Sequence, residues 1–377
     1  SIQFGYDYAE DGWWMEASAT WIESEICPSL NDYISYLSSD RKKKDNAGNI
    51  ILLPAWFNRP ASQLYLSDGW HEYGSCIYVK HLSEKYGAAK IKSIWETCGG
   101  NTQSLDAIKN VLGGDSQFNN DFRDFTVWNY FTHGRESYYN PHYATAGEYP
   151  AISIEASVPG TKIYPFSNSY TLPALSSMYF EFKKKYDLKS NNPQRLDIKF
   201  GTLGNVQNVG IAKVILMKKD GSQAEVKEIQ MSPLSGAGGM TYDGLGTTYD
   251  RIILIVNNIS TNTSENIWVK ADAANQKNST SRLIKLSGYS WGNSTITSSL
   301  SSQSIKLQAV GDNIIDPGET IQLGINLTNI GDALVSAVHG RLTTDTSVIV
   351  NTPNQNYGDI APGGIAASGE KYIFSVP

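Results

Sequence analysis

Apolar residues recur with a helical period near the start of the chain. Between residues 12 and 23, Trp14, Ala17 and Trp21 fall at i, i+3 and i+7, on one face of a 3.6-residue period. Asp11 is an acceptable N-cap for a helix that begins at Gly12. Glu16 stands among these apolar residues, where a carboxylate is costly to bury without a partner. We therefore expect Glu16 to be a ligand, a member of an ion pair, or exposed to solvent.

The same period continues through the first third of the chain. In the most regular of these segments, Tyr73, Ile77 and His81 recur at i, i+4 and i+8, and Gly87 ends the helix as a C′ glycine. Two glycines at 113–114 separate the last two segments. After the helix that contains Trp14, the predicted helices are 28–37, 69–86, 88–97, 104–112 and 115–131.

The pattern changes to that of strands near residue 148. Residues 195–200 alternate apolar and polar side chains, and residues 211–217 run into Lys219-Asp220-Gly221, which is typical of a hairpin turn. Residues 251–257 form a continuous apolar run, as expected of a buried strand. Short strands bounded by turns predict an all-β sandwich.

A second change of composition follows this β-rich region. Residues 274–303 are rich in Ser, Thr and Asn and predict a linker with one strand at 282–286. Residues 321–327 alternate again and begin a smaller β-unit. The predicted fold class is therefore multidomain α plus all-β. Its predicted parts are a helical domain 1–147, a β-sandwich 148–273, the linker 274–303 and a β-domain 304–377.

Charge and composition exclude several classes of partner. The 377 residues carry a net charge of −6, and the one basic run, Arg41–Lys44, is followed by Asp45. We expect a solvated polar loop at 38–50 and no nucleic-acid binding. No stretch approaches the roughly twenty apolar residues of a membrane span. The 22 tyrosines, with many Asn, Ser and Thr residues, favour a secreted or cell-surface protein.

The three cysteines do not define a metal site. Cys27, Cys76 and Cys98 are too few and too widely spaced for a zinc cluster or a disulfide framework. At most one pair can bridge, and Cys27 with Cys98 is the candidate pair.

The first predicted helix resembles a known motif. Trp13, Glu16, Ala17, Ala19 and Glu23 match Trp-x-x-Glu-(Gly/Ala)-x-Ala-x-x-x-Glu, which is found in the second helix of gluzincin zinc metallopeptidases. The resemblance implies that Glu16 is the third zinc ligand and that Glu23 supports the site or lies on the surface. It also implies a helical lobe of such an enzyme.

The first zinc-binding motif of that family does not occur in the chain. The single His-Glu pair, His71-Glu72, has Ser75 where His-Glu-x-x-His needs its second histidine. The first seven residues, SIQFGYD, resemble the segment that follows this motif in secreted bacterial and archaeal metalloproteases. We therefore expect the chain to be a fragment that starts directly after the motif, and to be inactive alone because the motif's glutamate is the general base.

His71 and Tyr73 are candidate catalytic residues by the same resemblance. Aminopeptidases of the gluzincin group have Tyr-x-x-Gly at the start of a later helix, where the phenol faces the oxyanion. Here His71-Glu72-Tyr73-Gly74 has the same context, with His71 in the tyrosine position. A positioned donor near the developing negative charge is the physical requirement. The alternative is a histidine at a helix start that packs on Trp70.

The far end of the chain resembles a second family. Gly311-Asp312, then Asp316–Thr320 (DPGET), and 358–363 (GDIAPG) resemble the entry and exit segments of immunoglobulin-like repeats in secreted bacterial proteins. Asp312, Asp316 and Glu319 group three carboxylates in eight residues, which makes them a candidate calcium site. The alternative is a turn in which aspartate caps the local backbone. We expect this β-domain to be truncated.

Together these features predict part of a secreted zinc metallopeptidase that acts on protein or peptide substrates. The accessory β-domains are expected to contact a cell surface or polysaccharide. Two alternatives remain open: a non-enzymatic adhesion or carbohydrate-binding protein, and a pseudo-peptidase that keeps the fold without its metal.

Overall fold

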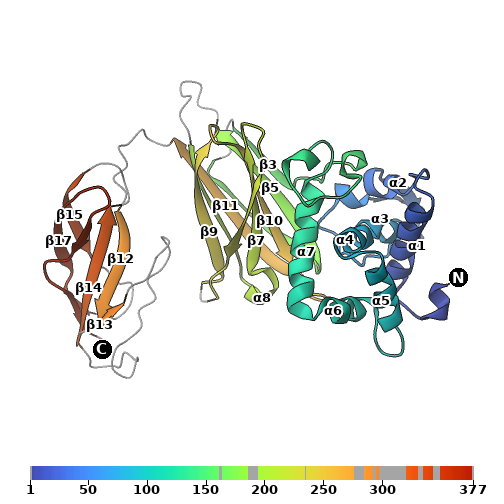
Figure 1. Cartoon of the computed structure of the whole chain (residues 1–377), viewed down its shortest axis with the longest axis horizontal. Coiled ribbons are helices and arrows are strands. Elements are labelled where there is room, and N and C mark those ends of the chain that lie inside the picture. The colour runs from blue at the N-terminus through green and yellow to red at the C-terminus, as the bar shows by residue number, and fades with distance from the viewer. Residues whose placement is uncertain are drawn as a thin grey trace. The chain divides into compact units, whose positions relative to one another are not determined.

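The computed structural model describes residues 2–160, 164–185, 194–233, 235–275, 284–291, 294–296, 320–329, 334–342 and 349–375. The chain divides into two compact units, Ser1–Gln276 and Lys277–Pro377. Figure 1 shows helices and several β-sheets along the chain, so the prediction of a mixed α and β multidomain protein is confirmed at that level. Among the described residues, no helix is long and apolar enough to cross a membrane.

Helices make up most of the first half of unit 1. The predicted helix 69–86 is present as two helices that meet at Ser75, and the predicted helix 104–112 has the same bounds in the structure. Gly113 ends that helix in the left-handed conformation at φ 102°, which glycine adopts without steric cost. The helices are α1 (Gly12–Ile26), α2 (Ile34–Ser38), α3 (His71–Gly74), α4 (Cys76–Tyr86), α5 (Ala89–Thr97), α6 (Ser104–Leu112) and α7 (Asp115–Tyr130).

The prediction of a polar loop at 38–50 is wrong. Strand β1 (Arg41–Lys44) pairs antiparallel with β2 (Ile50–Leu53). The Asp45 carboxylate fixes the connecting turn, because its Oδ1 accepts hydrogen bonds from the backbone N–H groups of Ala47 (2.9 Å) and Asn49 (2.8 Å). The four basic side chains are exposed on this hairpin, so they face solvent from a strand rather than from a loop.

Among the residues that the structure describes, nine strands form the β-rich half of unit 1. β10 pairs antiparallel with β5 and β7, whereas β6 pairs antiparallel with β9 and β11. A single parallel residue pair, Tyr249 with Leu245, connects these two groups. The strands are β3 (Ala156–Gly160), β4 (Phe166–Leu172), β5 (Ser176–Lys185), β6 (Gln194–Thr202), β7 (Ile211–Lys218), β8 (Glu225–Gln230), β9 (Ala237–Leu245), β10 (Tyr249–Asn258) and β11 (Glu265–Asn275), with a short helix α8 (Val206–Val209) before β7.

Strand β10 contributes side chains to two hydrophobic cores, one on each of its faces. On β10, Ile253 packs with the helices, whereas Leu254 packs in a second core that includes Phe200 of β6 and Val269 of β11. Side chains of successive strand residues point to opposite faces, so helices cover one face of β10 and strands cover the other. Figure 1 shows α7 alongside β10 and β7. This arrangement confirms the prediction of a buried strand at 251–257 and gives its reason.

Unit 2 is built from strands in the residues that the structure describes. The predicted strand 282–286 is present, from Ile284, as part of β12, which pairs with β14. Tyr357 and Tyr372 pack in a small core with Leu323 and Phe374. The strands are β12 (Ile284–Trp291), β13 (Ser294–Ile296), β14 (Thr320–Asn329), β15 (Val335–Arg341), β16 (Ile349–Thr352), β17 (Asn354–Ile360), β18 (Ile365–Ala367) and β19 (Tyr372–Ser375).

Candidate active site

Glu16 lies in the first half of α1, on the border between its buried and exposed faces. Trp13, Trp14 and Ala17 are buried around it, whereas Glu16 itself is half-buried. Its carboxylate makes no hydrogen bond or ion pair with the described residues. Of the three expectations for Glu16, partial exposure is observed, whereas an ion pair is not observed among the described residues.

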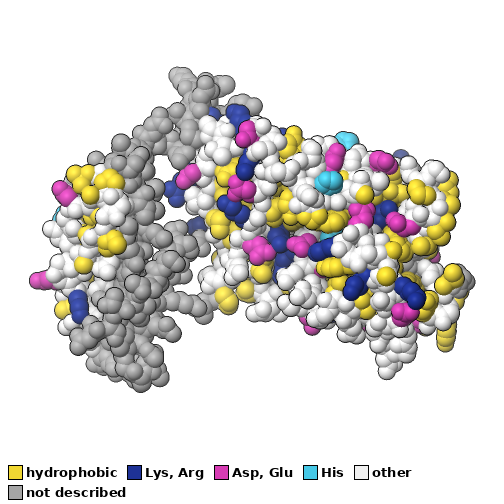
Figure 2. Space-filling model, in the orientation of Figure 1, with side chains coloured by type: hydrophobic (Ala, Val, Ile, Leu, Met, Phe, Trp, Pro, Cys, Tyr) yellow, Lys and Arg dark blue, Asp and Glu magenta, His cyan; other side chains and the backbone are white. Residues whose placement is uncertain are grey.

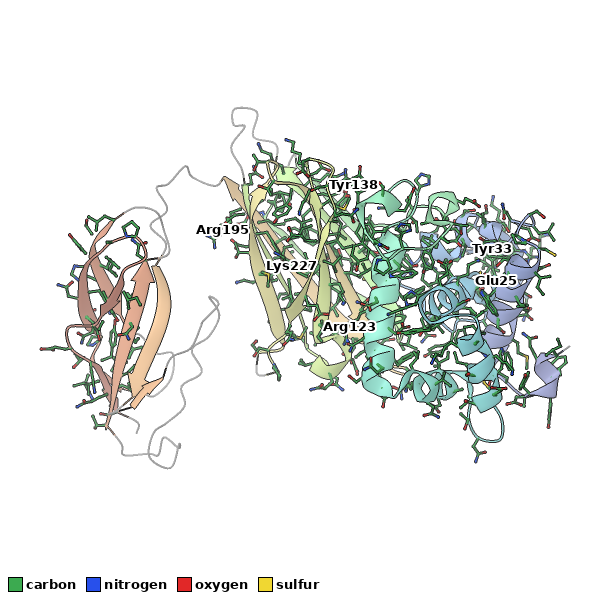
Figure 3. All side chains as sticks on the ribbon, in the orientation of Figure 1. Glu25, Tyr33, Arg123, Tyr138, Arg195 and Lys227 are labelled. Atoms are coloured by element: carbon green, nitrogen blue, oxygen red, sulfur yellow. The ribbon has the colours of Figure 1, made fainter. Side chains whose placement is uncertain are left out.

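A buried cation holds α1 against α4. The Lys80 ammonium lies 3.3 Å from Oε1 of Glu25 and 5.1 Å from the centre of the Tyr33 ring. Figure 3 shows Glu25 and Tyr33 near each other at the helical end of unit 1. Lys80 is only 6% exposed, so water screens its cation–π contact weakly. The Glu25 side chain is 42% exposed, so the ion pair is screened more strongly. The ion pair links the C-terminal half of α1 to α4, and the cation–π contact links α4 to Tyr33.

Tyr73, at the start of α3, is the predicted site residue on which the charge of Glu16 acts. Burial raises the pKa of the Tyr73 phenol, and the negative charges of Glu16 and Glu72 raise it further. The Tyr73 ring stacks on Tyr36 with 4.9 Å between ring centres. Tyr36 also packs edge-on against Trp70 at 4.5 Å. Tyr36 of α2, with Trp70 and Tyr73 at the start of α3, thus forms one half-buried aromatic surface.

Two carboxylates fix the start of α3. Glu72 accepts hydrogen bonds from the backbone N–H groups of Gly69 (2.9 Å) and Trp70 (3.1 Å). Oδ1 of Asp68 accepts from the N–H groups of Trp70 (2.9 Å) and His71 (2.8 Å). These contacts satisfy donors that the first turn of a helix leaves free. Glu72 therefore caps the start of α3.

Gly74 lets α3 approach its neighbours closely. A Cβ atom at this position would lie 2.8 Å from Cβ of Trp56 and 3.0 Å from the carbonyl oxygen of Tyr36. Both distances are shorter than ordinary carbon contacts. Close packing therefore accounts for the glycine in His71-Glu72-Tyr73-Gly74.

His71 lies in the core beneath this surface. It is 1% exposed, and its ring stacks on Trp56 at 6.1 Å rather than on Trp70. Burial lowers the pKa of His71 to about 4, which Asp68 opposes only in part. Neither ring nitrogen makes a hydrogen bond with the described residues, although the carbonyl of Gln63 favours the protonated form. At neutral pH the ring is uncharged. Of the two candidate donors, Tyr73 is the one that reaches solvent.

A buried charge network joins α4 to α7, and sequence reasoning missed it. Asp121 is 1% exposed and accepts hydrogen bonds from His81 Nε2 (3.1 Å), Lys85 Nζ (3.0 Å), Tyr86 (2.9 Å) and Tyr78 (3.2 Å). Burial raises the pKa of Asp121, but the charges and hydrogen bonds of His81 and Lys85 outweigh it, so the pKa falls to about 2. The sequence signal was a carboxylate in the aromatic segment 115–131.

The surface around this network mixes both signs of charge. Lys213 of β7 pairs with Asp124 (3.2 Å) and Glu228 (2.9 Å), and Asp124 also pairs with Lys85 (3.0 Å). On the face of unit 1 shown in Figure 2, acidic and basic side chains lie interspersed. This pattern ties the helices to the strands through ion pairs.

Metal ligands were also predicted at two places. In the part of the chain that the structure describes, no three His, Cys, Asp or Glu side chains gather to hold a metal ion. Glu16 is suited to one ligand position, because its carboxylate is half-buried and free of protein partners there. Asp312, Asp316 and Glu319, the candidate calcium ligands, lie outside the described residues. The cysteines are free thiols, including the pair Cys27 and Cys98.

Comparison with known proteins adds no assignment. No protein-family model matches the chain, and no curated protein is significantly similar to it. The geometry around Glu16 and the motif of α1 are therefore the basis for a functional proposal.

Proposed function

We propose that residues 1–147 are the helical lobe of a secreted, zinc-dependent metallopeptidase that hydrolyses peptide bonds. The observation that carries the proposal is the position of Glu16. It occupies the ligand position of the gluzincin-like motif, it is half-buried without a partner among the described residues, and its charge acts on the phenol of Tyr73. A capping or ion-paired glutamate, which is the alternative, would have such a partner.

Each residue has a distinct role in this proposal. Glu16 would supply one zinc ligand, and a zinc site of this type needs about two further protein ligands. A zinc ion held there would supply a water molecule activated as the nucleophile. Tyr73 donates its phenolic hydrogen to the oxyanion that forms on the substrate carbonyl. Stacking on Tyr36 and the close contact at Gly74 hold the phenol in place.

His71 has a supporting role in the same proposal. A neutral imidazole that is 1% exposed packs against Trp56 and positions α3. The donor predicted at either His71 or Tyr73 is therefore assigned to Tyr73.

Zinc content and peptide hydrolysis of the full-length gene product test the proposal. We expect stoichiometric zinc by elemental analysis, and casein hydrolysis that a chelator abolishes. Glu16→Gln should lose zinc and lower kcat/KM at least about a hundredfold, because a ligand is removed. The matched control Glu96→Gln, an exposed residue of α5, should keep both. A full-length product with neither zinc nor hydrolysis overturns the proposal.

The role of Tyr73 has its own test. Tyr73→Phe keeps the ring stack and removes the donor, so kcat should fall about 10²- to 10³-fold with KM little changed. Full activity in Tyr73→Phe would reject the oxyanion role while leaving the zinc role of Glu16 intact.

A further inference from the structure

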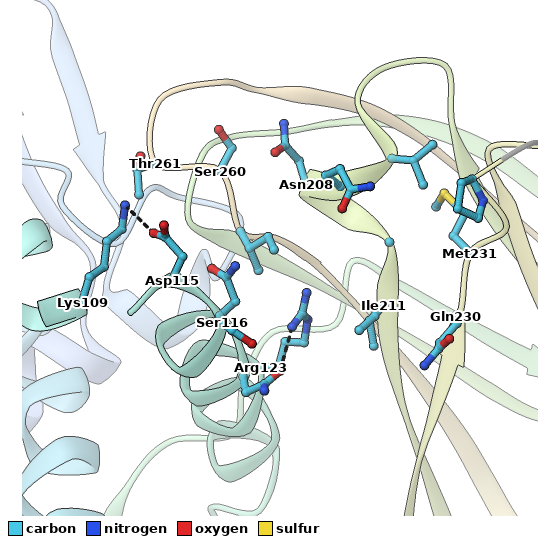
Figure 4. Close-up of a pocket in the computed structure, with 17 residues that line it drawn as sticks. Lys109, Asp115, Ser116, Arg123, Asn208, Ile211, Gln230, Met231, Ser260 and Thr261 are labelled. Carbon is cyan, nitrogen blue, oxygen red and sulfur yellow. Dashed lines mark hydrogen bonds and ion pairs between the residues drawn. The ribbon is translucent and has the colours of Figure 1, made fainter. Parts of the chain in front are cut away.

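A second polar site lies in unit 1, and it does not include Glu16, His71 or Tyr73. A pocket of about 670 Å³ is bounded by the N-terminal half of α7, by α8 and by the start of β7. Figure 4 shows its lining, with Arg123 between α7 and Ile211. This volume falls in the range of small-molecule sites.

Arg123 is a buried cation without a carboxylate partner among the described residues. Arg123 is 5% exposed. Its Nη1 donates a hydrogen bond to Oδ1 of Asn120 (3.1 Å), and its Nε has no acceptor among the described residues. The charges that favour its protonated form are those of Glu228 and Asp124, and Lys213 forms ion pairs with both of them. A guanidinium stays charged in proteins, and a buried charge is costly without a counter-ion. The guanidinium therefore has a buried N–H at Nε without an acceptor, and Arg123 is one of the residues that line the pocket.

The remaining charges of the lining cancel. Lys109 lies 3.2 Å from Asp115, and both line the pocket. The charge left over is that of Arg123, which fits a ligand with a single negative charge. An Arg fork binds a carboxylate through two parallel hydrogen bonds.

The rest of the lining is rich in side-chain amides and hydroxyls. Six of these residues are Ser116, Asn119, Gln207, Gln230, Ser260 and Thr261. Each amide offers both donors and an acceptor, and each hydroxyl offers both functions, which matches a ligand that carries several hydroxyl groups. The lining holds no aromatic side chain among the described residues, so a flat apolar ligand finds no stacking surface there.

We propose that this pocket binds a hydroxyl-rich monocarboxylate of the size of a sugar acid, such as a hexuronate. The carboxylate sits on the Arg123 guanidinium, and the ligand hydroxyls pair with the surrounding amides. The site stands independently of the zinc site at Glu16, because the two share no residue.

Calorimetric titration of the chain with three probes tests this site. Glucuronate carries both features, glucose lacks the carboxylate, and acetate lacks the hydroxyls. We expect glucuronate to bind at least about tenfold more tightly than either, since a hydrogen bond to a charged group and the additional neutral ones each add affinity. Absence of glucuronate binding, or equal binding of glucose or acetate, overturns the proposal.

Two variants locate the binding. Arg123→Gln should weaken glucuronate binding about tenfold or more. Gln230→Glu places a negative charge in the lining at an exposed position. This charge repels the ligand carboxylate, so the variant should weaken glucuronate binding to a similar extent without changing a core residue. Gln322→Glu, an exposed residue outside the lining, makes the same charge change and should leave binding unchanged. If Arg123→Gln does not fold, Gln230→Glu decides: unchanged affinity in that variant overturns the proposal.

Discussion

Asp121→Asn should destabilise unit 1 in a way that depends on pH. The pKa of Asp121 falls from its ordinary 3.8 to about 2 in the folded chain. Each pKa unit corresponds to about 1.4 kcal/mol, so the folded state favours the charged form by about 2–3 kcal/mol. Because Asp121 is only 1% exposed, solvent screening lowers this free energy only slightly. Asparagine keeps the shape but leaves Lys85 without its buried counter-charge, and we expect a loss of about 3 kcal/mol at pH 7.

Urea unfolding at several pH values measures this effect. Tryptophan fluorescence reports mainly on unit 1, because Trp291 alone of the nine tryptophans lies outside it. A carboxylate with a depressed pKa contributes its stability above the unfolded-state value of 3.8 and loses it as pH falls through about 2. The difference in free energy of unfolding between wild type and Asp121→Asn should therefore be largest above pH 4 and vanish near pH 2. The control Asp106→Asn, an exposed residue 3.9 Å from Lys109, should cost under about 1 kcal/mol. A cost below about 1 kcal/mol for Asp121→Asn, or one independent of pH, would refute the reasoning.

Three further outcomes follow from the packing of unit 1. Gly74→Ala should lower the free energy of unfolding by about 1–3 kcal/mol, because its Cβ would lie 2.8 Å from Cβ of Trp56; Gly5→Ala, with open space around it, is the control, and equal stability of the two variants would contradict the expectation. Native-state alkylation followed by mass spectrometry should modify the exposed Cys27 and spare the two buried cysteines, whose thiol pKa values burial raises. Finally, the ring of His71, with its pKa lowered to about 4, should stay neutral by NMR down to about pH 5. In the unfolded chain the pKa of this residue returns to about 6.5, so the unfolded state binds a proton first as the pH falls. His71 should therefore lower the free energy of unfolding by up to about 3 kcal/mol between pH 6.5 and pH 4. A ring that titrates near pH 6.5 in the folded chain would be inconsistent with its burial.

The sequence alone determined most of the local structure. The helix 104–112 was predicted to the residue, because it has apolar residues at a helical period and a glycine pair directly after it. The strand at 251–257 was visible as a continuous apolar run. The hairpin at 41–53 was not, because its side chains are nearly all exposed and its pairing depends on a turn that Asp45 stabilises rather than on hydrophobic alternation.

For the candidate site, the sequence marked Glu16 through the spacing of its motif, and tertiary structure decided what surrounds it. The effect of the Glu16 charge on Tyr73 and the burial of His71 both depend on how α3 packs on α1 and Trp56. The sequence placed the two candidate donors two positions apart but could not say which of them faces solvent.

The charged groups of the interior depended wholly on tertiary structure. Asp121 and Arg123 stand two positions apart on α7, and both are buried. Asp121 meets His81 and Lys85 of α4, whereas Arg123 faces a polar pocket beside β7 and has no carboxylate partner among the described residues. Sequence fixes the face of a helix that a residue occupies, but the partner of a buried charge comes from whichever distant segment packs against that face.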